Sequence, residues 1–291
     1  MQEIALFSAH NNYVLGLAFS IDGRMLISSG MDKQVKLWSV PDWKPLKAVQ
    51  VHDNSVNSIA LAPDGLTLAT GSTDTTVRLW SFPQMELRHS MQDRKKVVAV
   101  VRISTDGQMV AAGAYGGRVA VWSLGGEPIA AWQTPFKNLA GLAFSPDNRH
   151  LATSGLGDTI VLWELPGGKA VGELSGHQTA VLGLRFIHSG QRLVSVGYDQ
   201  TIRFWDARTW QPERSLPAPG VGLRGLAFSP DEKVVAVSLE SLVQLRRVED
   251  WEPLADLPMS TKVVNGMAFT PDGRMLAIGG ADKKIRVWDI S

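Results

Sequence analysis

The stretch KQVKLWSVPDWKPLKAVQVH, residues 33–52, contains a β-prone run ending in tryptophan, a turn around Pro-Asp, a second apolar run and a histidine. The pattern returns along the whole chain. Its tryptophan register is occupied by Trp38, Trp80, Trp122, Trp163, Trp205, Arg246 and Trp288. Successive members are 41 or 42 residues apart. A fixed period of this length indicates a repeat architecture, which decides the fold before local propensities are considered.

Each repeat also carries a turn marker on the same beat, such as IDG at 21, PDG at 63 and PDG at 271. Pro presets φ, Asp bonds its own following backbone, and Gly accepts positive φ, so these triplets predict tight turns. Between the turns lie short β-prone runs, such as VLGLAF (14–19), RMLISS (24–29) and QVKLW (34–38). Each repeat therefore predicts four strands and no helix.

These residues resemble the WD-repeat β-propeller family, whose signature is a Gly-His-like pair, a turn Asp and a closing Trp-Asp in units of about 40 to 45 residues. The resemblance extends from residue 2 to residue 291. It implies an all-β, seven-bladed propeller with four-stranded antiparallel blades. Another propeller class or a β-solenoid is the structural alternative. The phrase LAFSPD, at 142–147 and 226–231, is similar to bacterial members of the family.

The last repeat is shorter than the others. Counted from the histidine register, the units run 10–51, 52–93, 94–134, 135–176, 177–218, 219–259 and 260–291. The last has 32 residues, and residues 1–9 restore it to 41. An open propeller would leave unpaired strand edges, so we expect the N-terminal strand to complete the last blade and close the ring. Residues 1–291 are accordingly expected to form a single propeller domain.

Composition limits the classes of function. The net charge is +1, so no bulk field favours a nucleic acid or an anionic membrane. There is no cysteine, hence neither a disulfide framework nor a thiolate site. The N-terminus lacks a basic region followed by an apolar run, and no apolar stretch of 18 residues occurs. We expect a cytoplasmic protein that does not bind membranes.

Three repeats carry a complete set of His, Ser or Thr, Asp and Trp. The sets are His10, Ser28, Asp32 and Trp38; His52, Thr70, Asp74 and Trp80; and His177, Ser195, Asp199 and Trp205. A His-Asp-Ser set is also typical of a catalytic triad. The family resemblance instead implies buried hydrogen-bonded tetrads, and repetition around a ring favours that structural role. The other histidines stand alone and no phosphate-binding glycine loop occurs, so we expect no metal and no cofactor.

Other repeats depart from the tetrad. The third has Arg94, Ala112 and Gly116 in place of His, Ser and Asp. In the sixth, Pro219 occupies the histidine register, and Arg246 occupies the tryptophan register, where a charged head must reach solvent or a partner. The nearest candidate partner for Arg246 is Glu240. We expect these blades to depend more on apolar packing.

The family resemblance places partner docking on the loops that carry the His register and the turn Asp. Carried across, the candidate partner-binding residues are Tyr13, Met31, Arg94, Lys95, Lys96, Tyr115, Phe136, Lys137, Leu156 and Tyr198. The third and fourth repeats stand out because they combine Tyr115, Phe136 and Leu156 with four cations. Exposed aromatic residues beside cations are typical of interfaces.

We therefore expect a non-catalytic scaffold that docks one or more proteins, acidic and with an apolar anchor. Two alternatives stay open: an enzyme with a site at the channel mouth, and a less favoured nucleic-acid platform that uses the lysines of the third repeat. The sequence pattern does not determine the oligomeric state or the partner's identity.

Overall fold

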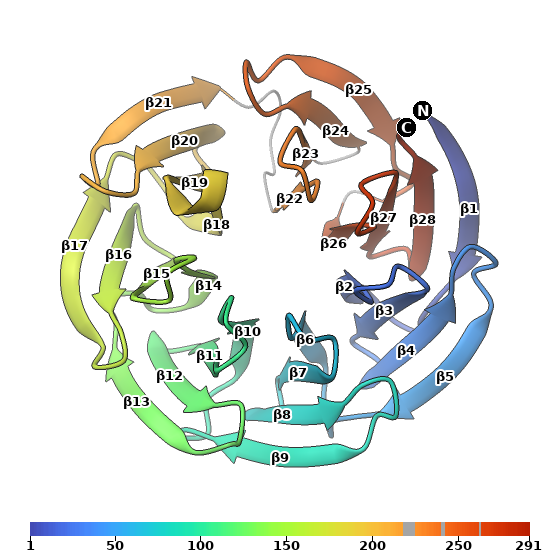
Figure 1. Ribbon diagram of the computed structural model, residues 1–291, viewed down its shortest axis with the longest axis horizontal. Helices are drawn as coiled ribbons and strands as arrows, with labels where there is room; N and C mark the ends of the chain where they lie inside the picture. The colour runs from blue at the N-terminus through green and yellow to red at the C-terminus, as the bar shows by residue number, and fades with distance from the viewer. Residues whose placement is uncertain (218–224, 240–241, 262) are drawn as a thin grey trace. The chain divides into compact units, whose positions relative to one another are not determined.

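The computed structural model describes residues 1–217, 225–239, 242–261 and 263–291. In these residues the chain forms seven sheets of four strands, and Figure 1 shows them as the blades of a propeller. The predicted seven-bladed β-propeller with four-stranded antiparallel blades is confirmed. Pro219 and Glu240 lie outside the described residues.

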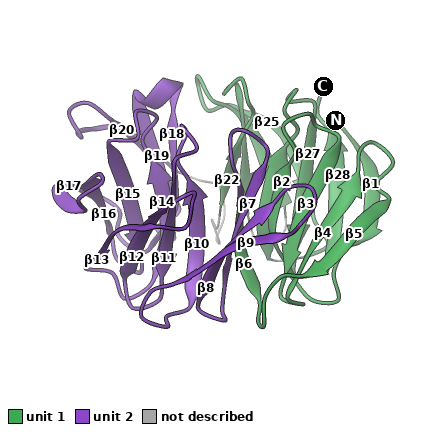
Figure 2. Cartoon of the chain, turned by 60° about the horizontal axis from the view of Figure 1, so that its bottom comes forward, with its two compact units in different colours: residues 1–59, 220–291 green, residues 60–219 purple. Residues whose placement is uncertain are grey.

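The chain divides into two compact units, coloured separately in Figure 2. The first unit comprises residues 1–59 and 220–291. It holds sheets of order β2-β3-β4-β5, β22-β23-β24-β25 and β1-β28-β27-β26. Their strands are β1 (Gln2–Ser8), β2 (Val14–Phe19), β3 (Met25–Gly30), β4 (Gln34–Ser39), β5 (Pro45–Gln50), β22 (Leu226–Phe228), β23 (Val234–Ser238), β24 (Leu242–Arg247), β25 (Pro253–Pro258), β26 (Val264–Phe269), β27 (Met275–Gly280) and β28 (Lys284–Asp289).

The second unit comprises residues 60–219. Three of its sheets have the orders β10-β11-β12-β13, β14-β15-β16-β17 and β18-β19-β20-β21. It also contains β7, β8 and β9 of the sheet of order β6-β7-β8-β9. A 3-10 turn, η1 (His188–Gly190), lies between β18 and β19. The strands of these sheets are β6 (Val56–Leu61), β7 (Thr67–Ser72), β8 (Thr76–Ser81), β9 (Leu87–Gln92), β10 (Val98–Ile103), β11 (Met109–Ala114), β12 (Arg118–Ser123), β13 (Pro128–Gln133), β14 (Leu139–Phe144), β15 (His150–Gly155), β16 (Thr159–Glu164), β17 (Lys169–Ser175), β18 (Val181–Ile187), β19 (Arg192–Gly197), β20 (Thr201–Asp206) and β21 (Pro212–Pro217).

The N-terminal strand completes the last blade, as predicted. Strand β1 pairs antiparallel with β28, from Gln2 opposite Asp289 to Ser8 opposite Lys284. The buried Arg286 reinforces the pairing, because its guanidinium lies 3.4 Å from Glu3 on β1 and 2.7 Å from Asp282 in the preceding turn. The edge that β28 would otherwise expose is covered, so the ring is closed by its first strand.

The burial of the strands follows their order within each blade. In the blade β14 to β17, the third strand β16 buries Ile160, Val161, Leu162 and Trp163, whereas the outer strand β17 is largely exposed. On the innermost strand there is no room for a side chain at Gly141, since a Cβ there would lie 2.3 Å from the Ser154 hydroxyl. The apolar core therefore lies between blade faces, and the side chains available to partners lie on loops and outer strands.

Candidate functional site

The first tetrad forms one chain of hydrogen bonds through a buried part of its blade. The loop before β2 supplies His10, whose Nδ1 lies 2.8 Å from Asp32 Oδ1 and whose Nε2 lies 2.8 Å from Ser28 Oγ. The Trp38 indole N–H donates to the same hydroxyl at 2.9 Å. Asp32 also accepts from the backbone N–H of Asn11 at 2.9 Å. The chain thus links the entry loop, the turn Asp and two strands.

The tetrad of the fifth repeat has the same geometry. His177 Nδ1 lies 2.9 Å from Asp199 Oδ2, and His177 Nε2 lies 2.8 Å from Ser195 Oγ, which also accepts from the Trp205 indole at 2.9 Å. An ionised carboxylate only accepts, so Nδ1 carries the proton and Nε2 of the neutral ring accepts from Ser195. The hydroxyl is fully buried between two ring systems, which leaves no space beside it for a substrate.

Burial and hydrogen bonding set the ionisation of this pair. Burial lowers the pKa of His177 below its ordinary value, although the Asp199 carboxylate opposes that shift. Burial on its own would raise the pKa of Asp199, but hydrogen bonds from the Gln178 N–H, Thr201 and His177 lower it below its ordinary value. Neutral His177 beside ionised Asp199 is therefore the favoured state.

Two further blades keep the hydrogen bond from the tryptophan to the hydroxyl. In the second repeat the Trp80 indole donates to Thr70 Oγ1 at 3.0 Å, and His52 is buried. In the fourth, Trp163 donates to Thr153 Oγ1 at 2.8 Å. In the seventh, by contrast, the Trp288 indole N–H is buried and has no hydrogen-bond partner among the described residues.

Arg246, in the tryptophan register of the sixth repeat, is bound within its own blade. Its Nε donates to Gln244 Oε1 at 2.7 Å, and its Nη1 donates to the Trp251 carbonyl at 2.8 Å. Glu240, the partner expected from the sequence, lies outside the described residues. A local amide and a carbonyl thus each accept one hydrogen bond from the guanidinium.

Two exposed apolar side chains predicted for docking lie on either side of Asn138. Tyr115 follows β11 and forms an isolated antiparallel bridge with Asn138. Leu156 follows β15, and its backbone N–H donates to the Asn138 carbonyl at 3.0 Å. Their exposed fractions are 48% for Tyr115 and 51% for Leu156. Strand ends of two neighbouring blades therefore hold two large apolar groups in solvent around one backbone segment.

Two of the predicted cations, Lys96 and Lys137, lie beside these groups. The Lys96 side chain passes over Gly116, next to Tyr115, since a Cβ at Gly116 would lie 3.8 Å from Lys96 Cε. Lys137 is exposed, and its carbonyl accepts from the Gly116 N–H at 2.6 Å. Arg94 and Lys95 are also exposed. We call Tyr115, Leu156, Arg94, Lys95, Lys96 and Lys137 the Asn138 surface.

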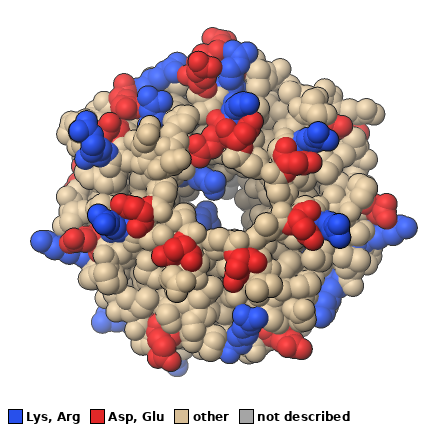
Figure 3. All heavy atoms as spheres, viewed as in Figure 1, with Lys and Arg blue, Asp and Glu red and all other residues tan. Residues whose placement is uncertain are grey.

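The charge of the Asn138 surface differs from that of the face seen in Figure 3. On that face acidic and basic side chains are interspersed, without a broad region of either sign. The Asn138 surface has four cations, and the carboxylates close by in sequence are the exposed Asp158 and Asp93, which is paired with Arg118. A local positive field therefore surrounds its two apolar groups.

The expectation that Phe136 is exposed is wrong. Phe136 is only 4% exposed and packs in a core cluster with Leu139, Leu142 and Trp163. The residue opposite is Gly157, where a Cβ would lie 3.2 Å from the Phe136 ring. The absence of a side chain at 157 leaves space for the ring to turn inward, so Phe136 supports the loop below the Asn138 surface.

The other predicted docking residues lie elsewhere. Tyr13 and Met31, in the first unit, are both exposed, and the Met31 N–H donates to the Tyr13 carbonyl at 3.0 Å. Tyr198 is exposed in the second unit, where its N–H donates to the Ala180 carbonyl at 2.8 Å. Neither the pair of Tyr13 and Met31 nor Tyr198 combines two exposed apolar side chains with several cations, as the Asn138 surface does.

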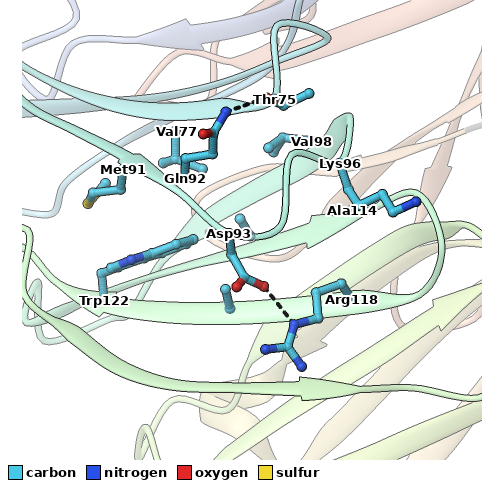
Figure 4. A pocket seen from close by; sticks show the side chains of 12 residues that line it. Thr75, Val77, Met91, Gln92, Asp93, Lys96, Val98, Ala114, Arg118 and Trp122 are labelled. Atoms are coloured by element: carbon cyan, nitrogen blue, oxygen red, sulfur yellow. Dashed lines mark hydrogen bonds and ion pairs between the residues drawn. The ribbon is translucent and has the colours of Figure 1, made fainter.

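The structure also shows a pocket that sequence reasoning missed, and it lies within the second unit (Figure 4). Its polar side chains include Asp93 and Arg118, whose Oδ2 and Nε lie 2.6 Å apart. Its apolar wall includes Trp122 and Ala112. The sequence signal was the loss of His, Ser and Asp from the third repeat, which predicted apolar packing and not a pocket.

No group of three or more His, Cys, Asp or Glu residues in the described ranges is arranged to hold a metal ion. In the same part of the chain, no helix has both the length and the apolar character needed to cross a bilayer.

Comparison with known proteins identifies relatives of the repeats. Residues 2–209 match the family described as IFT122 first beta-propeller, and residues 251–289 match the WD domain, G-beta repeat. Protein HIR1 of Mycosarcoma maydis is 31% identical over 107 residues, which are 34% of this chain and 10% of that protein. Nuclear distribution protein nudF of Aspergillus niger is 36% identical over 85 residues, 27% of this chain and 19% of that protein.

Transducin beta-like protein 2 of Homo sapiens is 28% identical over 129 residues, which are 38% of this chain and 29% of that protein. In these three comparisons the aligned segment is less than a third of the relative's own length. The similarity therefore concerns the repeats.

Proposed function

Because the chain belongs to the WD-repeat β-propeller family, we propose that it is a non-catalytic scaffold that docks a protein through the Asn138 surface. This proposal rests on one observation: Tyr115 and Leu156 are both about half exposed, and the backbone of each contacts the backbone of Asn138. Aromatic and large apolar side chains concentrate interface energy when a partner covers them.

The surrounding charges define the kind of partner. Arg94, Lys95, Lys96 and Lys137 form a cationic rim around the two apolar groups. Rim charges steer the encounter with an oppositely charged surface and add more to the association rate than to the final affinity. The partner we propose is acidic, with an apolar anchor that covers Tyr115 and Leu156.

The tetrads support the non-catalytic part of the proposal. A nucleophilic hydroxyl must be reachable by a substrate, whereas Ser28 and Ser195 are fully buried and each accepts a hydrogen bond from a tryptophan. The same arrangement occurs twice with closely similar distances, which is typical of a structural unit. A cytoplasmic location remains part of the proposal, and cell fractionation with immunoblotting tests it.

The test is capture of partners from the source cell by the wild type and by the double variant Tyr115→Ser/Leu156→Ser. The double variant should lose the main partner by about tenfold or more, as expected for loss of two anchors. Its melting temperature should stay close to that of the wild type, because both side chains point into solvent. Undiminished capture would refute the Asn138 surface as the docking site.

A matched control removes the same amount of apolar surface elsewhere. Leu46 on β5 and Leu87 on β9 are exposed to a similar extent, so Leu46→Ser/Leu87→Ser should capture the partner as the wild type does. If both double variants capture equally little of the partner, any loss of exposed apolar side chains weakens capture. That result would also contradict the proposal.

A further inference from the structure

The pocket in the second unit occupies the place where the tetrad is missing. In the first repeat, Ser28 accepts from the Trp38 indole and bonds to His10. The third repeat has Ala112 at the serine position and Arg94 at the histidine position. Arg94 is exposed, with its backbone at φ 50°, so no ring fills the histidine space. Small and outward-turned side chains thus leave a pocket beside Trp122.

The indole N–H of Trp122 is a donor without an acceptor. The structure shows no hydrogen bond from it to any described residue, and it is not among the fully buried unpaired atoms, as the indole of Trp288 is. Trp122 lines the pocket, and its unpaired N–H is not fully buried, so an acceptor can reach it. A donor held in an apolar wall favours an incoming oxygen acceptor, because an unpaired polar group there costs free energy.

The walls and rim further define the occupant. Val77, Met91, Val98 and Ala120 supply apolar lining, and Figure 4 shows two polar interactions among the lining residues. Asp93 is paired with Arg118 at 2.6 Å, and Gln92 Nε2 donates to Thr75 Oγ1 at 2.5 Å. Lys96 is the remaining charged residue of the lining. The formal charge of Asp93, Arg118 and Lys96 together is +1, which favours an anion over a neutral group.

The space is small. The empty volume is about 260 Å³ with open solvent included, and the pocket has room for about one water-sized group. A carboxylate oxygen has that size, whereas a leucine or phenylalanine side chain does not fit without movement of the walls. One oxygen would accept from Trp122, and the excess positive charge of the lining would offset the negative charge of the carboxylate.

We infer that this pocket binds the carboxylate of a short acidic side chain, an aspartate, presented by the docked protein. The inference rests on the proposed function, because Lys96 belongs both to the pocket lining and to the Asn138 surface. A bound aspartate would satisfy the Trp122 indole and neutralise the excess charge. The aspartate would thus add a specific polar contact to the apolar contacts that the partner makes with Tyr115 and Leu156.

The binding test uses the indole N–H signals of the ¹⁵N-labelled protein, with the Trp122 signal assigned from a Trp122→Phe spectrum. The probes are N-acetyl-aspartate N-methylamide and its uncharged asparagine analogue at equal ionic strength. The aspartate probe should shift the Trp122 signal saturably and bind at least about fivefold more tightly than the asparagine probe, as charged hydrogen bonds require. An unmoved Trp122 signal, or equal affinity for both probes, would overturn the inference.

Two variants keep the test decisive. Ala112→Ser restores the hydroxyl that other repeats have, so it should occupy the indole and weaken the aspartate probe about tenfold. It should not lower the melting temperature. Lys96→Met removes the rim charge and should weaken the same probe without affecting the Trp122 signal of the free protein. Unchanged probe affinity in both variants would exclude this pocket as the binding site.

Capture of the wild-type partner separates this inference from the proposed function. Ala112→Ser should reduce capture about tenfold, as expected if one charge-assisted contact is lost. Full capture by Ala112→Ser, together with loss in Tyr115→Ser/Leu156→Ser, would overturn the pocket inference and leave the docking surface standing. Full capture by both variants would overturn the proposed function.

Discussion

Replacing Ser195 by alanine tests the tetrads at their central atom. The Ser195 hydroxyl lies 2.8 Å from His177 Nε2 and accepts from the Trp205 indole at 2.9 Å. Ser195→Ala leaves both groups buried without that partner. Each unsatisfied buried group costs about 1–3 kcal/mol, so we expect a loss of about 2–6 kcal/mol in the free energy of unfolding. For a chain of this size, that corresponds to a fall in melting temperature of at least about 4 °C.

The assay is urea unfolding followed by tryptophan fluorescence, with scanning calorimetry as a second probe. The control is Ser215→Ala, the same chemical change at an exposed position of β21 in the same blade. The double variant His177→Ala/Ser195→Ala should cost less than the sum of the two single variants, because both remove one shared hydrogen bond. A Ser195→Ala protein as stable as the wild type would refute the structural interpretation of the tetrads.

Three further predictions concern closure, pH and charge. Deleting residues 1–8 uncovers the edge of β28 and should cause a large fall in melting temperature or aggregation; an unchanged melting curve would contradict closure by β1. Burial lowers the folded-state pKa of His177 below its ordinary value of 6.5, so the contribution of His177 to the free energy of unfolding is fully present above pH 6.5 and is lost as pH falls through the folded-state pKa. His177→Asn should remove that part of the pH dependence. If the free energy of unfolding in urea has the same slope against pH between about pH 7 and 5 in both proteins, the prediction is contradicted. Lys95→Glu/Lys137→Glu should slow association with an acidic partner and flatten its salt dependence in surface plasmon resonance, whereas an unaltered association rate would show that the cationic rim does not steer the partner.

The fold was predictable because single residues mark the period of the repeat. Trp38 and its counterparts every 41 or 42 residues specify equivalent strands, and each turn marker specifies the reversal between two of them. The short last repeat indicated the pairing of β1 with β28, since residues 1–9 restore it to the length of the other repeats. Repetition made the prediction robust, because an error in one repeat would have been visible against the others.

The candidate site was predictable only in part. The register placed Tyr115 and Leu156 on neighbouring loops, and both are exposed. It could not determine the direction of the Phe136 side chain, which depends on the space left by Gly157 on another loop. The position of a residue in a repeat specifies where its Cα lies in the blade. The burial of its side chain depends also on the side-chain volumes of segments distant in the sequence.

The pocket beside Trp122 shows the same limit. The substitutions Arg94, Ala112 and Gly116 were visible in the sequence, and they predicted apolar packing without the tetrad. The pair of Asp93 and Arg118 joins residues that are far apart in the chain. Arg118 takes the register position of Thr201, which in the fifth repeat bonds the turn Asp. That substitution was a second signal, beside the loss of His, Ser and Asp, that this blade differs from the others.

Amide hydrogen exchange of the captured complex determines whether the partner docks at the Asn138 surface. We expect slower exchange on binding in the loops at residues 94–97, 115–117 and 155–158, with no change in the outer strands β5 and β9. Protection confined to other loops, with residues 115–117 and 155–158 exchanging as in the free protein, would contradict docking at this surface.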